Sequence, residues 1–298
     1  MKISVYILLL ISILFSGSFT AQSEDPVVVD KEIKKIRFGL KGFSSIGWLT
    51  PENELSLTRG KIGIGFGWGL NTELYINNTT SFRTGFSLST FSGGLNYNDN
   101  SKTLNEETYK STYYVVDGGE FQEWENDSIV PSGEMFKLNS RKFDLRYINI
   151  PLILKLKTKE IGYMTYFGEF GGVLGFKTKA SSEDTQINVS LDTLNNKYVT
   201  QGNPSVPTND FNINDVSQPV RAGLCLGAGA EYNFSGSTAI FFQLNWNYFM
   251  TSMLKKQDKD NYLRSFKPSE DPGISGKFEA VNSKSIPGSF HLTVGILF

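Results

Sequence analysis

Apolar and polar residues alternate with a period of two along most of this chain. The alternation is clearest in 62–76, where every second residue except Thr72 is apolar and four of the residues between them are glycine. A β-strand turns successive side chains to opposite faces, so such a segment has one apolar face and one small or polar face. The same test predicts eight strands in all, near residues 36–48, 62–76, 81–92, 142–157, 163–177, 218–234, 238–250 and 286–298.

The fourth segment departs from the simple pattern. Phe143, Leu145 and Tyr147 occupy one phase of the alternation, whereas the apolar residues from Ile148 onward occupy the other. A change of phase inside one strand is typical of a β-bulge, so we predict a bulge here. Pro151 in the same segment is also unusual for a paired strand.

The connections between these segments alternate strictly between long and short. Bacterial outer-membrane barrels have an even number of antiparallel strands, short periplasmic turns and longer extracellular loops. We therefore predict an all-β fold, an eight-stranded antiparallel up-and-down transmembrane β-barrel whose first and last strands pair. A soluble β-sandwich is the alternative, but it is not expected to sort its connections by length. The short connections are 77–80, 158–162 and 235–237, and the long ones are 49–60, 93–141, 178–217 and 251–285.

The last predicted strand carries an apolar residue at every second position and ends on an aromatic one. This arrangement resembles the terminal signal by which outer-membrane barrels are assembled. It predicts two partners, the lipid of the outer membrane and the machinery that inserts barrels into it. The candidate signal residues are Phe290, Leu292, Val294, Ile296 and Phe298.

The beginning of the chain has the features of a signal peptide. One lysine precedes an apolar run, and small residues then lead to a polar segment, which predicts a signal peptide at 1–21. The apolar run is shorter than the ~20 residues that a spanning helix needs. We expect 22–35 to be a short periplasmic segment, 36–298 to be the barrel domain, and the mature protein to reside in the outer membrane.

Composition excludes several classes of function. The chain has 29 Lys and Arg against 30 Asp and Glu, so it shows no basic bias towards nucleic acid. Cys225 and His291 are its only cysteine and histidine, which excludes an internal disulfide and a Cys/His metal cage. We expect no cofactor.

Three stretches of the chain resemble a known family. They are 146–155, which contains Tyr-x-x-Ile-Pro-Leu-x-Leu-Lys, and the glycine-rich stretches 168–172 and 227–232. Together they resemble the outer-membrane β-barrel family of Bacteroidota that includes the PorT-like proteins. The resemblance covers most of the chain after Ile36. It implies the barrel architecture and, less specifically, a part in protein export across the outer membrane.

Charged residues are expected on the inner face of the strands. An eight-stranded barrel is just wide enough for its side chains to fill it, and buried charges need partners. We expect a plug of salt bridges, with Glu73 paired to Arg83 and with Glu231 or Lys155 at the same depth. The alternative is a gated path for a small solute or ion. The predicted inner residues are Arg37, Lys41, Glu73, Arg83, Lys155, Glu169, Arg221, Glu231 and His291.

Candidate residues for catalysis and for partner binding are less clearly marked in the sequence. Ser289 and His291 share a strand face, but an inward polar histidine explains the pair better than an acyl-transfer site does. The long acidic loop 93–141 carries aromatic residues, which are candidate contacts for an extracellular or periplasmic protein partner. We therefore expect a non-enzymatic scaffold or binding barrel, with a narrow transport or export-accessory barrel as the alternative. The candidate loop contacts are Tyr113, Tyr114, Phe121 and Trp124.

Overall fold

The eight alternating segments form eight long strands in the computed structural model of the chain. Segments 1–21 and 22–35 lie outside the residues that the structure describes, so the signal peptide and the periplasmic segment stay predictions. The described residues belong to one compact unit, Lys34–Phe298. They are 36–52, 57–97, 111–124, 129–192, 197–207, 210–235, 238–255, 262–267 and 277–298.

The long strands form a closed ring. Each pairs antiparallel with the next long strand along the chain, and β1 pairs with β14 to close the ring. The predicted eight-stranded up-and-down barrel is therefore confirmed. The ring strands are β1 (Ile36–Pro51), β2 (Thr58–Tyr75), β3 (Thr80–Asn96), β6 (Glu134–Lys157), β7 (Met164–Asp192), β10 (Val220–Ser235), β11 (Thr238–Phe249) and β14 (Ser285–Leu297).

The two ends of the barrel differ, and we call them the turn end and the loop end. The turn end holds the short connections 76–79 and 158–163. The first and last strands also meet there, where Phe38 and Phe298 exchange two backbone hydrogen bonds of 3.1 and 2.8 Å. The loop end lies at the other ends of the strands.

Apolar side chains form a belt around the outside of the ring. Ile64, Phe66 and Trp68 are 67%, 65% and 55% exposed, and the alternate positions of the other ring strands follow the same pattern. A continuous exposed apolar surface of this kind suits hydrocarbon and not water. In the described part of the chain, no helix is long and apolar enough to cross a membrane.

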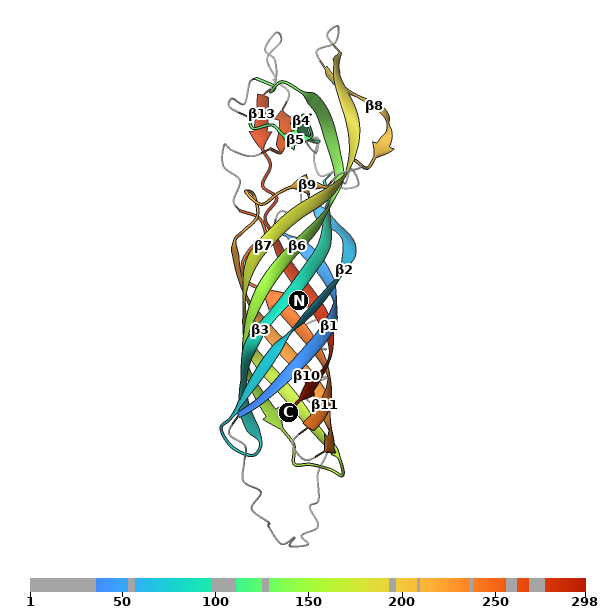
Figure 1. Ribbon diagram of the computed structural model, residues 1–298. Helices are drawn as coiled ribbons and strands as arrows, with labels where there is room; N and C mark the ends of the chain where they lie inside the picture. Colours follow the sequence, from blue (N-terminus) through green and yellow to red (C-terminus); the bar gives the residue numbers. More distant parts are fainter. Residues whose placement is uncertain are drawn as a thin grey trace, which may run out of the picture. The chain divides into compact units, whose positions relative to one another are not determined.

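The strands continue past the predicted ends at the loop end. Segments 93–141 and 178–217 were expected to be loops, but β3 runs to Asn96, β6 begins at Glu134 and β7 runs to Asp192. Six short strands join these extensions, and Figure 1 shows β4, β5, β8 and β13 grouped beyond this end of the ring. We call this part the cap. Its short strands are β4 (Thr112–Asp117), β5 (Glu120–Phe121), β8 (Lys197–Ser205), β9 (Phe211–Asn212), β12 (Arg264–Lys267) and β13 (Lys277–Ala280).

The predicted change of phase in β6 is wrong. Phe143, Leu145 and Tyr147 point inward and are buried, and so are Ile153 and Lys155 farther along the strand. The odd-numbered positions therefore face inward over this whole stretch. The chemistry of the interior changes along the strand instead. It is polar towards the turn end and apolar at the loop end.

Two bulges occur in the pairing of β6 with β7, one at Asn139 of β6, before the predicted segment, and one on the neighbouring strand. The pairing of β6 with β7 passes from Arg146↔Lys179 to Tyr147↔Lys177. Thr178 of β7 is therefore the extra residue. This bulge shifts the inward face of β7 from odd-numbered to even-numbered positions and leaves the buried face of β6 unchanged.

Most of the buried apolar residues at the loop end form one cluster, which we call the loop-end core. It draws on the upper halves of the ring strands and on the cap, so it fills the barrel at this level. Its members are Leu49, Leu57, Phe91, Leu95, Tyr97, Tyr114, Phe136, Leu138, Phe143, Leu145, Tyr147, Ala180, Phe211, Ile213, Met253, Leu254, Leu263 and Val281.

The inward glycines of β2 allow close packing inside the ring. A Cβ added to Gly67 would lie 2.3 Å from Cζ of Phe43 and 2.6 Å from the carbonyl oxygen of Leu88. Glycine is therefore needed at this position because a neighbouring ring occupies the space that a side chain would take.

Candidate functional site

A network of charges occupies the turn end of the interior. Lys155 Nζ lies 2.5 Å from Glu73 Oε1 and also donates to Glu231. Lys157 Nζ lies 3.3 Å from Glu73 and 2.9 Å from Glu231, and Arg37 lies 3.4 Å from Glu231. Three cations therefore share two carboxylates. Sequence reasoning missed Lys157, although its odd-numbered position on the same strand as Lys155 already placed it inward.

A second group of polar residues lies above this network. Arg83 Nη2 is 2.6 Å from Glu169 Oε2, and Arg83 Nη1 donates to Gln243 Oε1 at 2.7 Å. Gln243 Nε2 in turn donates to Glu169 at 2.6 Å. Each of these side chains is buried, and together they form a closed ring of hydrogen bonds across the barrel.

The predicted pairing of Glu73 with Arg83 is wrong, although the two residues lie directly opposite each other on β2 and β3. Glu73 instead binds Lys155 on β6, and Arg83 binds Glu169 on β7. Both pairs join strands that are two apart in the ring. Long side chains on the inside of a narrow barrel converge across the lumen, so their charged ends meet partners beyond the adjacent strand.

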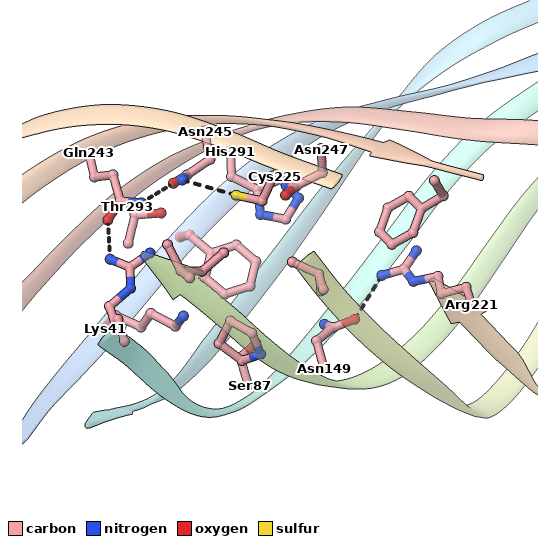
Figure 2. Close-up of a pocket in the computed structure, with 16 residues that line it drawn as sticks. Lys41, Ser87, Asn149, Arg221, Cys225, Gln243, Asn245, Asn247, His291 and Thr293 are labelled. Atoms are coloured by element: carbon pink, nitrogen blue, oxygen red, sulfur yellow. Dashed lines mark hydrogen bonds between the residues drawn. The ribbon is translucent and has the colours of Figure 1, made fainter. Parts of the chain in front are cut away.

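A pocket lies between this group and the loop-end core. About 50 Å³ is open within it, enough for a few water molecules. Figure 2 shows Lys41 and Arg221 entering it, together with neutral polar side chains from β6, β11 and β14. Arg221 Nη2 donates to Asn149 Oδ1 at 3.0 Å. Its guanidinium carbon lies 3.6 Å from the ring centroid of Tyr147 and 4.1 Å from that of Phe249.

The remaining polar candidate, His291, lines the same pocket. Its Nε2 lies 3.0 Å from Ser289 Oγ, and its ring stacks on Phe43 with centroids 4.9 Å apart. Among the described residues, no carboxylate is hydrogen-bonded to His291, so the arrangement lacks the group that orients a catalytic base. Nor do the described residues include a group of His, Cys, Asp or Glu side chains that could hold a metal ion.

A buried ion pair joins two ring strands inside the cap. Arg141 Nε and Nη2 each lie 2.7 Å from an oxygen of Asp184. Burial opposes charge on Arg141, but the Asp184 carboxylate outweighs it and raises the pKa of Arg141 above its usual range. Sequence reasoning assigned both residues to loops and missed the pair. For Arg141 the signal was the inward phase of β6, continued above the predicted strand end. Asp184 turns inward only because of the bulge at Thr178, which the alternation along β7 does not predict.

The candidate loop contacts lie mainly inside the cap. Tyr114 is fully buried and donates to Gln186, and Trp124 is only 3% exposed. Phe121 is half-buried and stacks on Phe211 with centroids 4.5 Å apart. Tyr113 is half-buried as well. Tyr114 and Trp124 thus form cores of the cap, and the expectation that they are exposed binding anchors is wrong, because the segment folds into strands.

Four of the candidate assembly residues lie on the outward face of β14, and Phe298 follows its last residue. Phe290, Leu292, Val294, Ile296 and Phe298 are between 44% and 58% exposed. Leu297 on the other face is buried. The structure thus places these five side chains in the belt, and their part in assembly stays a prediction.

Comparison with known proteins gives one family and several solved structures. A family model described as outer membrane protein beta-barrel domain matches residues 20–254. Neisserial surface protein A is 12% identical over 87% of this chain and 95% of that chain, with a TM-score of 0.35. OprG from Pseudomonas aeruginosa is 8% identical over 88% and 95%, with a TM-score of 0.37. Ail of Yersinia pestis is 11% identical over 88% and 98%, with a TM-score of 0.31. No curated protein matches the chain.

Proposed function

The chain belongs to the outer membrane protein β-barrel domain family, and from this premise we propose that it is a non-enzymatic scaffold or binding protein that acts through its cap. Membership of the family indicates the outer membrane as its location. The turn end then faces the periplasm, and the loop end with the cap faces the outside of the cell.

The filled interior is the observation that carries this proposal. The charge network occupies the turn end, the Arg83–Glu169 group lies above it, and the loop-end core fills the barrel beneath the cap. A water-filled path would have to pass through the loop-end core, which is packed with buried aliphatic and aromatic side chains. The arrangement therefore favours a closed barrel over a channel.

The cap suits a binding role because its own packing holds it in place. The loop-end core and the Arg141–Asp184 pair support its strands from inside. Its surface also carries apolar side chains, since Ile129, Val199 and Val206 are 64%, 46% and 54% exposed. A rigid surface loses little conformational entropy when it binds a partner, and we expect that partner to be an extracellular protein.

The alternative is a narrow transport or export-accessory barrel, as the resemblance to PorT-like proteins implies. The specific observation in its favour is the cationic pocket in the middle of the barrel. We further propose that residues 1–21 are removed during export and that the assembly machinery recognises β14.

Single-channel recording on purified, refolded protein separates the two functions. Heat-modifiable gel migration of the same preparation verifies that the barrel has folded. We expect no stepwise conductance, because the loop-end core blocks the lumen. Discrete current steps that grow with salt concentration would overturn the closed barrel and support the transport alternative.

The binding role needs its own measurement in intact cells. A photo-crosslinking residue at Val199 in the cap is expected to capture a defined protein partner. The matched control places the same residue at Leu244, which is 55% exposed in the belt and should crosslink only lipid. Capture at neither site would contradict the binding role.

A further inference from the structure

Cations outnumber carboxylates in the part of the interior that the belt surrounds. Among the described residues there, Glu73 and Glu231 are shared by three cations, and Glu169 is bound by Arg83. Within the same described ranges, no ion pair joins Lys41 or Arg221 to a carboxylate. These two basic side chains therefore have no ion-pair partner among the described residues.

Both of these basic side chains line the same pocket. Its lining includes Lys41, Arg83 and Arg221 but no aspartate or glutamate, and its other polar residues are neutral. Figure 2 shows Lys41 and Arg221 reaching it from separate strands, with Asn149 hydrogen-bonded to Arg221. Asn247 adds an amide that can donate. A cavity lined by cations and amide donors, without an acidic group, has the chemistry of an anion site.

Arg221 is held as a preformed anion donor. It is 5% exposed, and the rings of Tyr147 and Phe249 both pack against its guanidinium group. One edge donates to Asn149, whereas Nε and Nη1 have no hydrogen-bond partner in the described structure. Buried donors of a charged group are costly when left unpaired. The unpaired Nη1 donor at the end of this guanidinium group is therefore a position where a ligand would be stabilised.

We propose that the pocket lined by Lys41 and Arg221 binds one small inorganic anion of halide size. The open space of about 50 Å³ admits an ion as large as a few waters and excludes bulky organic acids. The ion balances charge that would otherwise be buried alone inside the membrane. This site goes beyond the proposed binding role of the cap, because a closed barrel holds the ion whether or not the cap has a partner.

The test compares chloride with gluconate, which is too large for the pocket, at equal ionic strength. Urea unfolding of the refolded protein in zwitterionic micelles measures the ratio of folded to unfolded protein. For one site, that ratio rises about 11-fold at a chloride concentration ten times the half-saturating value. Equal unfolding curves in chloride and gluconate would overturn the proposal.

Variants locate the effect. Lys41→Met should abolish the chloride dependence without loss of stability in gluconate, because Lys41 has no described hydrogen bond to lose. The matched control, Arg146→Gln, removes an exposed cation and should leave the chloride dependence intact. Chloride dependence that persists in Lys41→Met, or that disappears in Arg146→Gln, would contradict the assignment.

A measurement on the unaltered protein covers the case in which Lys41→Met does not fold. The ³⁵Cl resonance should be broadened by the refolded protein, and bromide should compete that broadening away. Absence of broadening beyond that seen with protein-free micelles would refute the site.

Discussion

Replacing Asp184 with asparagine tests whether a buried ion pair holds the cap on the barrel. Arg141 is 3% exposed and binds both carboxylate oxygens of Asp184. Asparagine keeps the shape of the side chain but removes its charge. A guanidinium group stays protonated in proteins, so Arg141 is left buried in the variant without a counter-charge.

The expected cost follows from the geometry. Removing one partner of a buried pair costs about 3–5 kcal/mol, which raises the equilibrium constant for cap opening by roughly two to three and a half orders of magnitude. The exposed pair Lys142–Asp144 lies beside it on β6, with side chains 46% and 40% exposed and a separation of 3.1 Å. Exposed pairs contribute about 0–1 kcal/mol. Asp144→Asn should therefore change cap opening by about fivefold at most.

Hydrogen exchange of cap amides in the refolded protein measures the opening directly, and limited proteolysis supports it. Asp184→Asn should accelerate exchange in β4 and at the start of β6, while the strands inside the belt keep their protection. The sign of the pH dependence is also determined. Folding raises the pKa of Arg141, and such a base contributes fully to the free energy of unfolding at any pH below its pKa in the unfolded chain. The contribution of Arg141 therefore stays constant through neutral pH. If Asp184→Asn and Asp144→Asn exchange at the same rate, the ion pair does not hold the cap.

Two further predictions concern the barrel interior. Gly67→Ala should lower the yield of folded barrel, because the added Cβ would overlap the ring of Phe43. The control Gly42→Ala should fold normally, because a Cβ there meets nothing within 4 Å. Equal yields of heat-modifiable barrel from the two variants would contradict the packing argument. A double-mutant cycle with Arg83→Met and Glu169→Gln, measured by urea unfolding, should give a coupling free energy of about 1–3 kcal/mol, and a value indistinguishable from zero would show that the pair contributes no net stability.

The alternation of side chains was enough to predict the ring and its outer face. From Ile62 to Ile76, the period of two decides which residues meet the membrane, and it does so without knowledge of any distant contact. The same local rule placed Glu73 and Arg83 inward, where the structure has them. Periodicity along one strand is a local property, and so it survives in the sequence alone.

Tertiary structure alone decided how the inward residues pair and where the strands end. Arg83 meets Glu169 and not Glu73 because the curvature of the ring brings side chains together across the lumen. Likewise, Phe143 and Tyr114 are buried because the loop end packs into a core that extends above the belt. The sequence by itself thus determined which face each side chain takes, since that follows from the backbone of one strand. Which partner it meets depends on the closure and curvature of all eight strands, and only the folded barrel supplies these.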